Sequence, residues 1–205
     1  MAIFCTDAGH GGSDGGAAYY GIKEKDINLQ FVTGLNNELK QRGHRVFTTR
    51  TDDVEVPNLG TRCKLINTHH QKAKPSFDAI VSIHCNAAAR KDTVTGKYKP
   101  VESARGLYVV YSSESDNSTK LADTLGTLFS ENSIALNHGG KVSTLQLGRT
   151  LAWIHKTVPP AVLIELGFLT NRDDSTLLKS PDHIEKLIML VSDGLEQFAT
   201  GSARG

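Results

Sequence analysis

Four residues have side chains suited to metal binding or acid–base chemistry and lie at or near the ends of predicted strands. His10 follows the first strand inside the glycine-rich residues 7–16, and Glu24 precedes the first long helix. His84 ends the third strand, and Glu165 ends the last one. Ligands in open α/β sheets collect at the carboxyl ends of the strands, so these side chains should meet in one pocket if those strand ends adjoin.

The chemistry of this set is that of a hydrolytic metal site. Two imidazoles and one carboxylate bind zinc tetrahedrally and leave the fourth position for water. Zinc lowers the pKa of a bound water to about 7 and polarises a carbonyl oxygen. A further carboxylate can accept the proton of the water and pass it to a leaving nitrogen. The four residues therefore match the needs of amide hydrolysis, although their wide spacing is by itself only suggestive.

Each of the four residues also has a structural interpretation. Taken singly, His10 and His84 are more simply explained as histidines that hydrogen-bond within the core. Glu24 fits an exposed first-turn carboxylate that complements the helix dipole. Glu165 lies between Ile and Leu, so its burial costs on the order of several kcal/mol unless it pairs with a buried arginine or a metal. The glycine-rich segment follows a first strand, as phosphate-binding turns do, but it matches neither common phosphate-binding motif.

The elements that must position these residues alternate between strand and helix. Short apolar runs predict buried strands at residues 2–6, 45–49, 78–84, 107–111 and 161–165. Apolar residues at helical spacing predict helices at residues 25–42, from 57 onward, around 121–129 and at 182–198. The polar stretch 90–105 is expected to be either disordered or a functional surface loop, and residues 200–205 a frayed, flexible tail.

These elements predict one three-layer α/β domain over residues 1–199. Its sheet is expected to be twisted and mainly parallel, with about six strands, and covered by helices on both faces. The net charge of +1 argues against nucleic acid or an anionic membrane recognised through overall charge. No apolar run approaches the roughly 18 residues of a spanning helix, and no secretory signal is visible. The three cysteines, without a CxxC pair, are expected to be reduced and buried, and the protein to be a monomer.

Five ordered groups of motifs cover nearly the whole chain. They are DAGHGGSDGG (7–16), TRTDD (49–53) with LGTRCKLIN (59–67), SIHCNA (82–87), ARGLYVVY (104–111) and PAVLIELGFLTN (160–171). In these motifs the chain resembles the zinc-dependent N-acetylmuramoyl-L-alanine amidases, the α/β-fold family of bacterial cell-division and autolytic amidases and many phage endolysins. It departs from the family at Gly15, where proline is usual, and at Ile154 and His155, where relatives tend to carry Leu-Arg.

The resemblance implies a role for each of the four residues. His10, Glu24 and His84 would bind one Zn²⁺ per chain, and Glu165 would be the catalytic carboxylate. The substrate would be peptidoglycan, cleaved at the amide between the lactyl group of N-acetylmuramic acid and L-alanine of the stem peptide.

Several nearby residues are candidates for supporting roles. Asn86, Tyr20 and Asn171 are candidates for contacts with the substrate or for orienting ligands, and a structural role is favoured for Asn171. Arg62 is expected to be either a core ion-pair partner or a structural anchor, and the role as an anchor is favoured. The role of His155 is left open.

Two origins of such an enzyme fit the sequence. We expect a compact phage endolysin, made in the host cytoplasm without a signal peptide, released to the wall by a holin, and without a separate wall-binding domain. The alternative is the catalytic domain of a bacterial autolysin or cell-separation amidase. A zinc peptidase and a non-catalytic wall-binding module stay open as other classes. Degenerate modules typically lack one of the four site residues, whereas this chain has all four.

Overall fold

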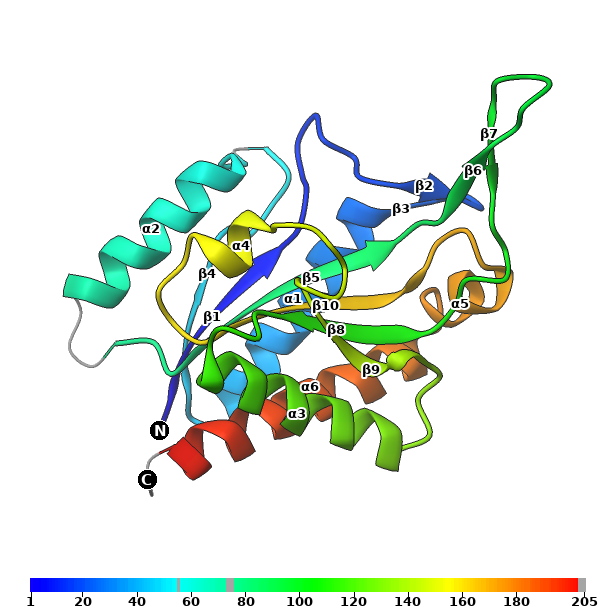
Figure 1. The fold of residues 1–205 in the computed structure, drawn as a ribbon. Helices are drawn as coiled ribbons and strands as arrows, with labels where there is room; N and C mark the ends of the chain where they lie inside the picture. The colour runs from blue at the N-terminus through cyan, green and yellow to red at the C-terminus, as the bar shows by residue number, and fades with distance from the viewer. Residues whose placement is uncertain (55, 73–75, 203–205) are drawn as a thin grey trace.

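A six-stranded sheet forms the centre of the protein in the computed structural model, which describes residues 1–54, 56–72 and 76–202 (Figure 1). The order of its strands is β4-β1-β5-β10-β8-β9. These strands are β1 (Ile3–Ala8), β4 (Arg45–Thr48), β5 (Ala79–Asn86), β8 (Leu107–Tyr111), β9 (Leu136–Ser143) and β10 (Ala161–Phe168). Two short hairpins lie outside this sheet, formed by β2 (Ala18–Tyr19) with β3 (Ile22–Lys23) and by β6 (Ala89–Lys91) with β7 (Tyr98–Pro100).

Strand direction determines which side chains share the edge that holds the site. β4, β1, β5 and β10 pair in parallel, whereas β8 pairs antiparallel with β10 and parallel with β9. The carboxyl ends of β1, β5 and β10 therefore lie side by side, as the sequence analysis requires. Because β8 is reversed, its amino end reaches this same edge.

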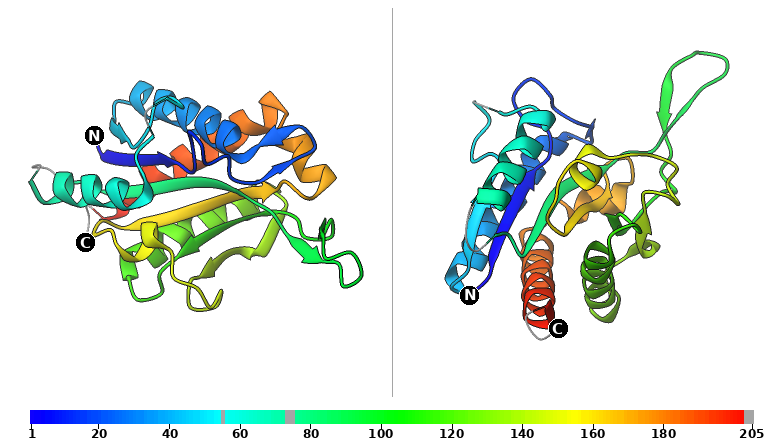
Figure 2. Two further views of the ribbon diagram at one scale, coloured as in Figure 1. Left: turned by 90° about the horizontal axis from the view of Figure 1, so that it is seen from above. Right: turned by 60° about the vertical axis from the view of Figure 1, so that its left-hand side comes forward.

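Helices cover both faces of the sheet (Figure 2). One face carries α1 (Glu24–Gln41), α3 (Asp116–Glu131) and α6 (Pro181–Ser202), and the other carries α2 (Leu59–Lys72) and the short α4 (Ala152–His155). A further short helix, α5 (Arg172–Leu177), follows β10. The larger core lies under α1, α3 and α6, where Phe31, Leu125 and Leu187 are fully buried. None of the helices in the described ranges is long and apolar enough to span a membrane.

The predicted three-layer α/β architecture with a mainly parallel sheet is confirmed, and several details differ. β9 is absent from the prediction because its glycines and His138, with φ of 49°, interrupt the apolar alternation. The polar stretch 90–105 is not disordered, since part of it forms the β6–β7 hairpin. α6 continues to Ser202, so residues 200–202 are helical rather than a frayed tail, and 203–205 lie outside the described residues.

Candidate metal centre

Three side chains from different elements converge at the carboxyl edge of the sheet. His10 lies in the loop after β1, Glu24 is the first residue of α1, and His84 lies near the end of β5. Glu24 Oε1 is 3.1 Å from His10 Nε2 and 2.9 Å from His84 Nδ1. Among the described residues, these three form a group whose possible ligand atoms all lie within 4.8 Å of one another. The loop after β1, the start of α1 and the end of β5 thus supply one compact set of donor atoms.

The geometry and charge of this donor set fit zinc. Tetrahedral ligands at about 2.0–2.2 Å from the ion lie roughly 3.3 Å from one another, which is close to the distances between Glu24 and both imidazoles. Burial raises the pKa of Glu24, but hydrogen bonds with His10 and His84 outweigh this effect and hold the pKa well below its usual value. The hydrogen bond between Glu24 and His10 also raises the pKa of His10 to about 9, although the partial burial of His10 opposes this shift. A carboxylate that favours positive charge on His10 in this way also favours a divalent cation.

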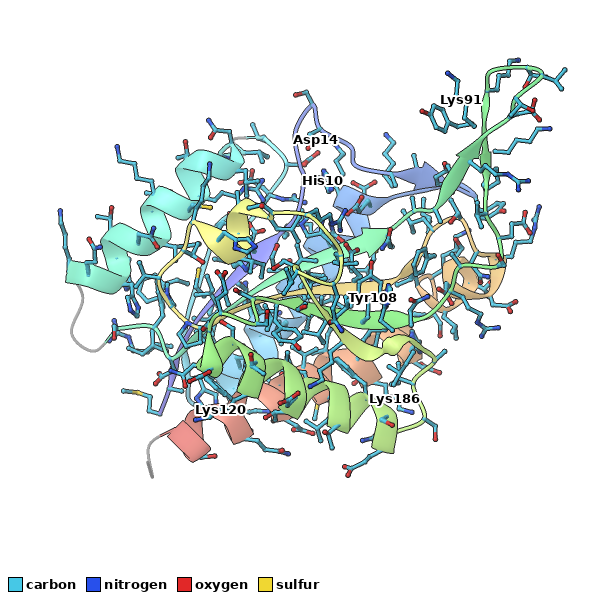
Figure 3. All side chains as sticks on the ribbon, viewed as in Figure 1. His10, Asp14, Lys91, Tyr108, Lys120 and Lys186 are labelled. Carbon is cyan, nitrogen blue, oxygen red and sulfur yellow. The ribbon has the colours of Figure 1, made fainter. Side chains whose placement is uncertain are left out.

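The loop that carries His10 is held in an unusual conformation. His10 has φ of 62°, a left-handed conformation that costs a non-glycine residue about 1–3 kcal/mol. Arg62 Nη2 donates to the carbonyl oxygen of His10 over 2.7 Å, and Asp14 Oδ2 lies 2.9 Å from His10 Nδ1. The contact with Asp14 orients the ring with Nε2 toward Glu24, as a hydrogen bond to the outer nitrogen does in metal-binding histidines. Figure 3 shows His10 and Asp14 on this loop, above the end of the sheet.

A buried polar network below the loop joins Asp7 to Arg62. Arg62 Nη1 donates to Asp7 Oδ1 over 2.9 Å and to the carbonyl oxygen of Ala8 over 2.8 Å. Ser82 donates to Asp7 Oδ2 over 2.5 Å, and Thr49 donates to Asp7 Oδ1. Asp7 and Arg62 are both buried. These contacts confirm that Arg62 is a structural anchor, and we call this network the polar floor of the site.

Two glycines leave room for the three side chains of the donor set. A Cβ atom on Gly9 would lie 2.3 Å from both Cε1 and Nε2 of His84. A Cβ atom on Gly16, whose φ is 63°, would lie 2.6 Å from Glu24 Oε2 and 2.9 Å from His10 Cδ2. The close approach of the ligands therefore accounts for these two glycines of the glycine-rich segment.

Glu165 lies next to His84 on the neighbouring strand. The two residues are in register between β10 and β5. Glu165 is buried, and its Oε2 has no hydrogen-bond partner among the described residues. Burial raises its pKa, while the nearby charge of His84 acts in the opposite direction. No arginine forms an ion pair with Glu165 within the described ranges, so the interpretation as a salt bridge to a buried arginine is wrong there.

Comparison with known proteins identifies the family. The family model described as N-acetylmuramoyl-L-alanine amidase matches residues 5–197. The chain belongs to the N-acetylmuramoyl-L-alanine amidase family. It is 32% identical over 195 residues to the probable cell wall amidase LytH of Staphylococcus aureus, in a match that covers 94% of this chain and 56% of that protein. The chain thus spans about half the length of the curated relatives it matches.

Solved structures of amidases share the fold. An N-acetylmuramoyl-L-alanine amidase from Clostridium difficile 630 is 27% identical, with a TM-score of 0.78, and the match covers 98% of this chain and 97% of that one. Ami1 from Mycobacterium smegmatis is 23% identical, with a TM-score of 0.80, and the match covers 98% and 97% of the two chains. The sheet and its helices are therefore those of an amidase catalytic domain.

Tyr108 is a residue of this amidase domain that the sequence analysis overlooks. It lies opposite Glu165 in the antiparallel pair of β8 and β10, and Asn86 Nδ2 contacts its hydroxyl. Burial and the nearby charge of Glu165 raise the pKa of Tyr108 to about 12. Tyr108 stands inside the motif ARGLYVVY, but its proximity to Glu165 depends on cross-strand register, which the motif does not reveal. Asn86, a candidate for substrate contact, is thus placed beside this tyrosine.

The other two candidate contact residues, Tyr20 and Asn171, meet at Glu102 rather than at the ligands. Tyr20 donates its hydroxyl to Glu102 Oε1 over 2.9 Å, and the guanidinium of Arg172 lies 4.6 Å from the centre of its ring. Asn171 Nδ2 donates to the carbonyl oxygen of Glu102 over 2.5 Å, and Asn171 Oδ1 caps α5 by accepting from the backbone N–H of Asp174. These bonds give Asn171 a structural role at the start of α5.

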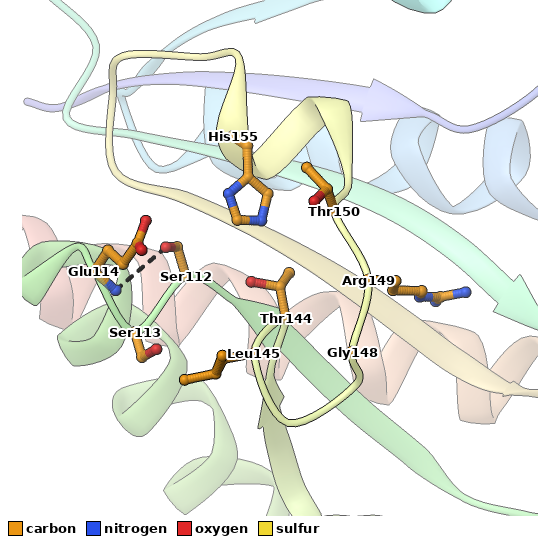
Figure 4. A pocket seen from close by; sticks show the side chains of 9 residues that line it. All are labelled: Ser112, Ser113, Glu114, Thr144, Leu145, Gly148, Arg149, Thr150 and His155. Carbon is orange, nitrogen blue, oxygen red and sulfur yellow. Dashed lines mark hydrogen bonds between the residues drawn. The ribbon is translucent and has the colours of Figure 1, made fainter.

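His155 lies away from the candidate metal centre. It lines a pocket of about 310 Å³ together with Ser112 and Thr144, which directly follow β8 and β9 (Figure 4). Because β8 and β9 run opposite to β10, this pocket lies at the opposite edge of the sheet from His84. Arg149 lies on the rim of the same pocket, and its side chain points away from His155. A second cleft, of about 330 Å³, is lined by His10 and His84 and therefore opens directly onto the donor set.

Proposed function

We propose that this chain is a zinc-dependent amidase that cleaves the bond between the lactyl group of N-acetylmuramic acid and L-alanine in peptidoglycan. One observation carries the proposal: the His10–Glu24–His84 donor set stands beside Glu165, a buried carboxylate with an oxygen that lacks a partner among the described residues. Membership of the family supports the substrate class. The activity of the complete protein is part of the proposal, because the chain spans about half of its curated relatives.

The residues of the site suit distinct steps of this reaction. His10, Glu24 and His84 would hold the ion, which when bound lowers the pKa of water and polarises the carbonyl. The Glu165 carboxylate would accept a proton as water attacks the lactyl carbonyl carbon. It would then donate that proton to the L-alanine nitrogen as the carbon–nitrogen bond breaks and the amine leaves. The raised pKa of Glu165 supports this role, since a group that both takes and gives a proton works best when its pKa is close to the working pH.

Product analysis on purified sacculi tests the reaction. The wild-type protein should release stem peptides that begin with a free L-alanine amine, and chelation should remove both zinc and activity. Glu165→Gln should keep zinc but lose activity by about 100- to 10,000-fold, the usual contribution of a general acid–base group. Glu114→Gln, an exposed change of the same kind, is the control.

The same experiment separates the alternative functions. Release of D-alanine or of dipeptides would assign a zinc peptidase. Binding to sacculi without product would assign a non-catalytic module. Full activity of Glu165→Gln would refute the proposed mechanism even if the product is that of an amidase.

We further propose that the enzyme acts as a phage endolysin, synthesised in the host cytoplasm as a monomer and released to the wall with a holin. The three cysteines support synthesis in a reducing compartment, because all are free and buried. The alternative is an autolytic or cell-separation amidase, in line with the likeness to a staphylococcal cell wall amidase. Expression with and without a holin tests this: an endolysin lyses cells only when the holin is present.

A further inference from the structure

The β6–β7 hairpin projects from the edge of the sheet that carries the metal centre (Figures 1 and 2). β6 begins three residues after Asn86, the last residue of β5, and β5 contains His84. All six strand residues of the hairpin are exposed. The strands of the hairpin therefore contribute no buried residue to the core, although the hairpin follows directly after β5, the strand that contains His84.

Specific hydrogen bonds shape the turn of this hairpin. Asp92 Oδ1 accepts from the backbone N–H of Val94 over 3.0 Å and from that of Thr95 over 2.7 Å. The backbone N–H of Asp92 donates to the carbonyl oxygen of Lys97 over 2.8 Å. Two-stranded hairpins are only marginally stable alone in water, so this set of bonds indicates a segment built to hold a shape.

The base of the hairpin is attached to the catalytic edge. The backbone N–H of Val101 donates to the carbonyl oxygen of Ala88 over 2.8 Å, which closes the two strands. The backbone N–H of Ala88 donates in turn to Thr170 Oγ1 over 3.1 Å, and Thr170 is fully buried just after β10. The position of the hairpin relative to the metal centre is therefore set by the two strands that hold His84 and Glu165.

The hairpin concentrates positive charge. Residues 90–99 hold four basic residues and one acidic residue, a net charge of +3, whereas the whole chain has +1. The rest of the chain therefore carries a net charge of −2, the difference between these values. Lys99 pairs with Asp92, but Arg90, Lys91 and Lys97 form no ion pair within the described ranges. Figure 3 shows Lys91 at the hairpin, away from the body of the protein.

The register of the strands places like charges opposite each other. Arg90 lies directly across from Lys99, an arrangement that destabilises a hairpin in isolation. On the other face, Lys91 lies across from Tyr98, whose side chain is 71% exposed. Arg90 and Lys99 share a single nearby counter-charge, Asp92, on one face, and the other face pairs a cation with an exposed aromatic ring. This combination suits a polymer that carries carboxylates beside sugar rings.

We propose that the β6–β7 hairpin binds the peptidoglycan strand on one side of the bond being cleaved, through the carboxylates of neighbouring stem peptides. This inference rests on the proposed function, which makes that polymer the substrate. Its support is charge complementarity together with the position of the hairpin: the hairpin projects from the same end of the sheet at which the cleft beside His10 and His84 opens (Figure 1). The hairpin would give the domain affinity for the polymer that the net charge of the chain does not supply.

Neutralising the three unpaired cations tests the proposal. Arg90→Gln/Lys91→Gln/Lys97→Gln leaves the Asp92–Lys99 pair and the turn intact. With sacculi stripped of phosphodiester polymers, KM should rise about tenfold, as expected for three exposed charge contacts. Turnover of a single soluble muramyl peptide, too short to reach the hairpin, should stay within about twofold of the wild-type rate by the same reasoning. In a Glu165→Gln background, which binds without cleaving, the protein with the neutralised hairpin should co-sediment less with the stripped sacculi than the protein with the original hairpin. Its binding should also depend less on salt concentration.

Two control variants make the result specific. Lys40→Gln/Lys120→Gln/Lys186→Gln removes the same charge from exposed positions on α1, α3 and α6 and should leave KM and pelleting unchanged. Arg90→Lys/Lys91→Arg/Lys97→Arg keeps the charge of the hairpin and should behave as the wild type.

The outcomes separate this proposal from the proposed function. If the wild-type protein hydrolyses neither substrate, the proposed function fails, and pelleting still tests the hairpin. The hairpin proposal is overturned if the neutral hairpin pellets like the wild type, or if the control on the helices weakens binding equally. It is also overturned if binding is lost only with sacculi that retain phosphodiester polymers, because that result assigns the hairpin to those polymers.

Discussion

Gly9→Ala adds one methyl group at the point where the loop after β1 passes His84. The new Cβ would lie 2.3 Å from Cε1 and Nε2 of the His84 ring, whereas ordinary contacts begin at 3.4 Å. Gly9 does not adopt a left-handed conformation, so alanine itself meets no backbone strain. The backbone has little freedom to move away, because the N–H of Gly9 donates to the carbonyl oxygen of Ile83 over 3.0 Å and its own carbonyl accepts from Asn28. The imidazole must therefore retreat by about 1.1 Å, the difference between 3.4 and 2.3 Å.

A displacement of this size is large for a metal ligand. Functional groups must be held within about 0.5 Å of their productive positions, and a misplacement of 1 Å can cost roughly 100-fold in rate. We therefore expect Gly9→Ala to lose about 100-fold in activity on sacculi, to bind zinc more weakly, and to lose about 1–3 kcal/mol of stability through overpacking.

Zinc content by mass spectrometry, dye release from labelled sacculi and urea unfolding measure these three effects. Gly15→Ala is the matched control, since a Cβ atom there meets nothing within 4 Å. If Gly9→Ala keeps full zinc and stays within about threefold of wild-type activity, a difference too small for a displaced ligand, the claim that His84 is a ligand in this geometry is refuted.

Two further predictions concern stability. Arg62→Leu should lower the free energy of unfolding, measured in urea, by about 3–5 kcal/mol, because it leaves Asp7 as an unpaired buried charge. The double variant Asp7→Asn/Arg62→Leu should lose less stability than the sum of the losses in the two single variants. If the losses are additive, the pairing of Asp7 with Arg62 is contradicted. Burial raises the pKa of Glu196, but hydrogen bonds with His44 and Arg42 outweigh it and leave the pKa below its usual value. The contribution of Glu196 is then present above its unfolded-state pKa of about 4.3 and is lost as the pH falls through the folded-state value. The difference in urea midpoint between wild type and Glu196→Gln should therefore be small at pH 7, as for other partly exposed pairs, and should vanish in acid; a difference that grows in acid would contradict this sign.

The sequence predicts most of the helices and strands because the spacing of apolar residues is a local property. The alternation of strands and helices follows from apolar spacing, and the prediction that His10, Glu24 and His84 meet follows from the parallel order of the strands. The reversal of β8 is not local, since the run 107–111 reads the same in either direction. The position of Tyr108 beside Glu165 depends on that reversal, and for that reason sequence patterns do not reveal it.

The chemical roles could be predicted only in part, for a related reason. A histidine or glutamate at a strand end shows that a group is available, but its environment depends on contacts between segments far apart in the chain. The left-handed conformation of His10, stabilised by Arg62 from 52 residues away, is one example. The absence of a partner for Glu165 Oε2 among the described residues is another.

The polar floor limits how this domain can be improved by selection or by design. Asp7 and Arg62 contribute to folding and also fix the loop that carries His10, so one substitution there changes both properties at once. On the opposite side of the sheet, the core under α1, α3 and α6 is apolar and includes neither Asp7 nor Arg62. Stabilising substitutions that preserve activity should therefore accumulate in that core. Substitutions that alter cleavage specificity near the polar floor will also lower stability, so they should be tolerated only after stabilising substitutions in the core.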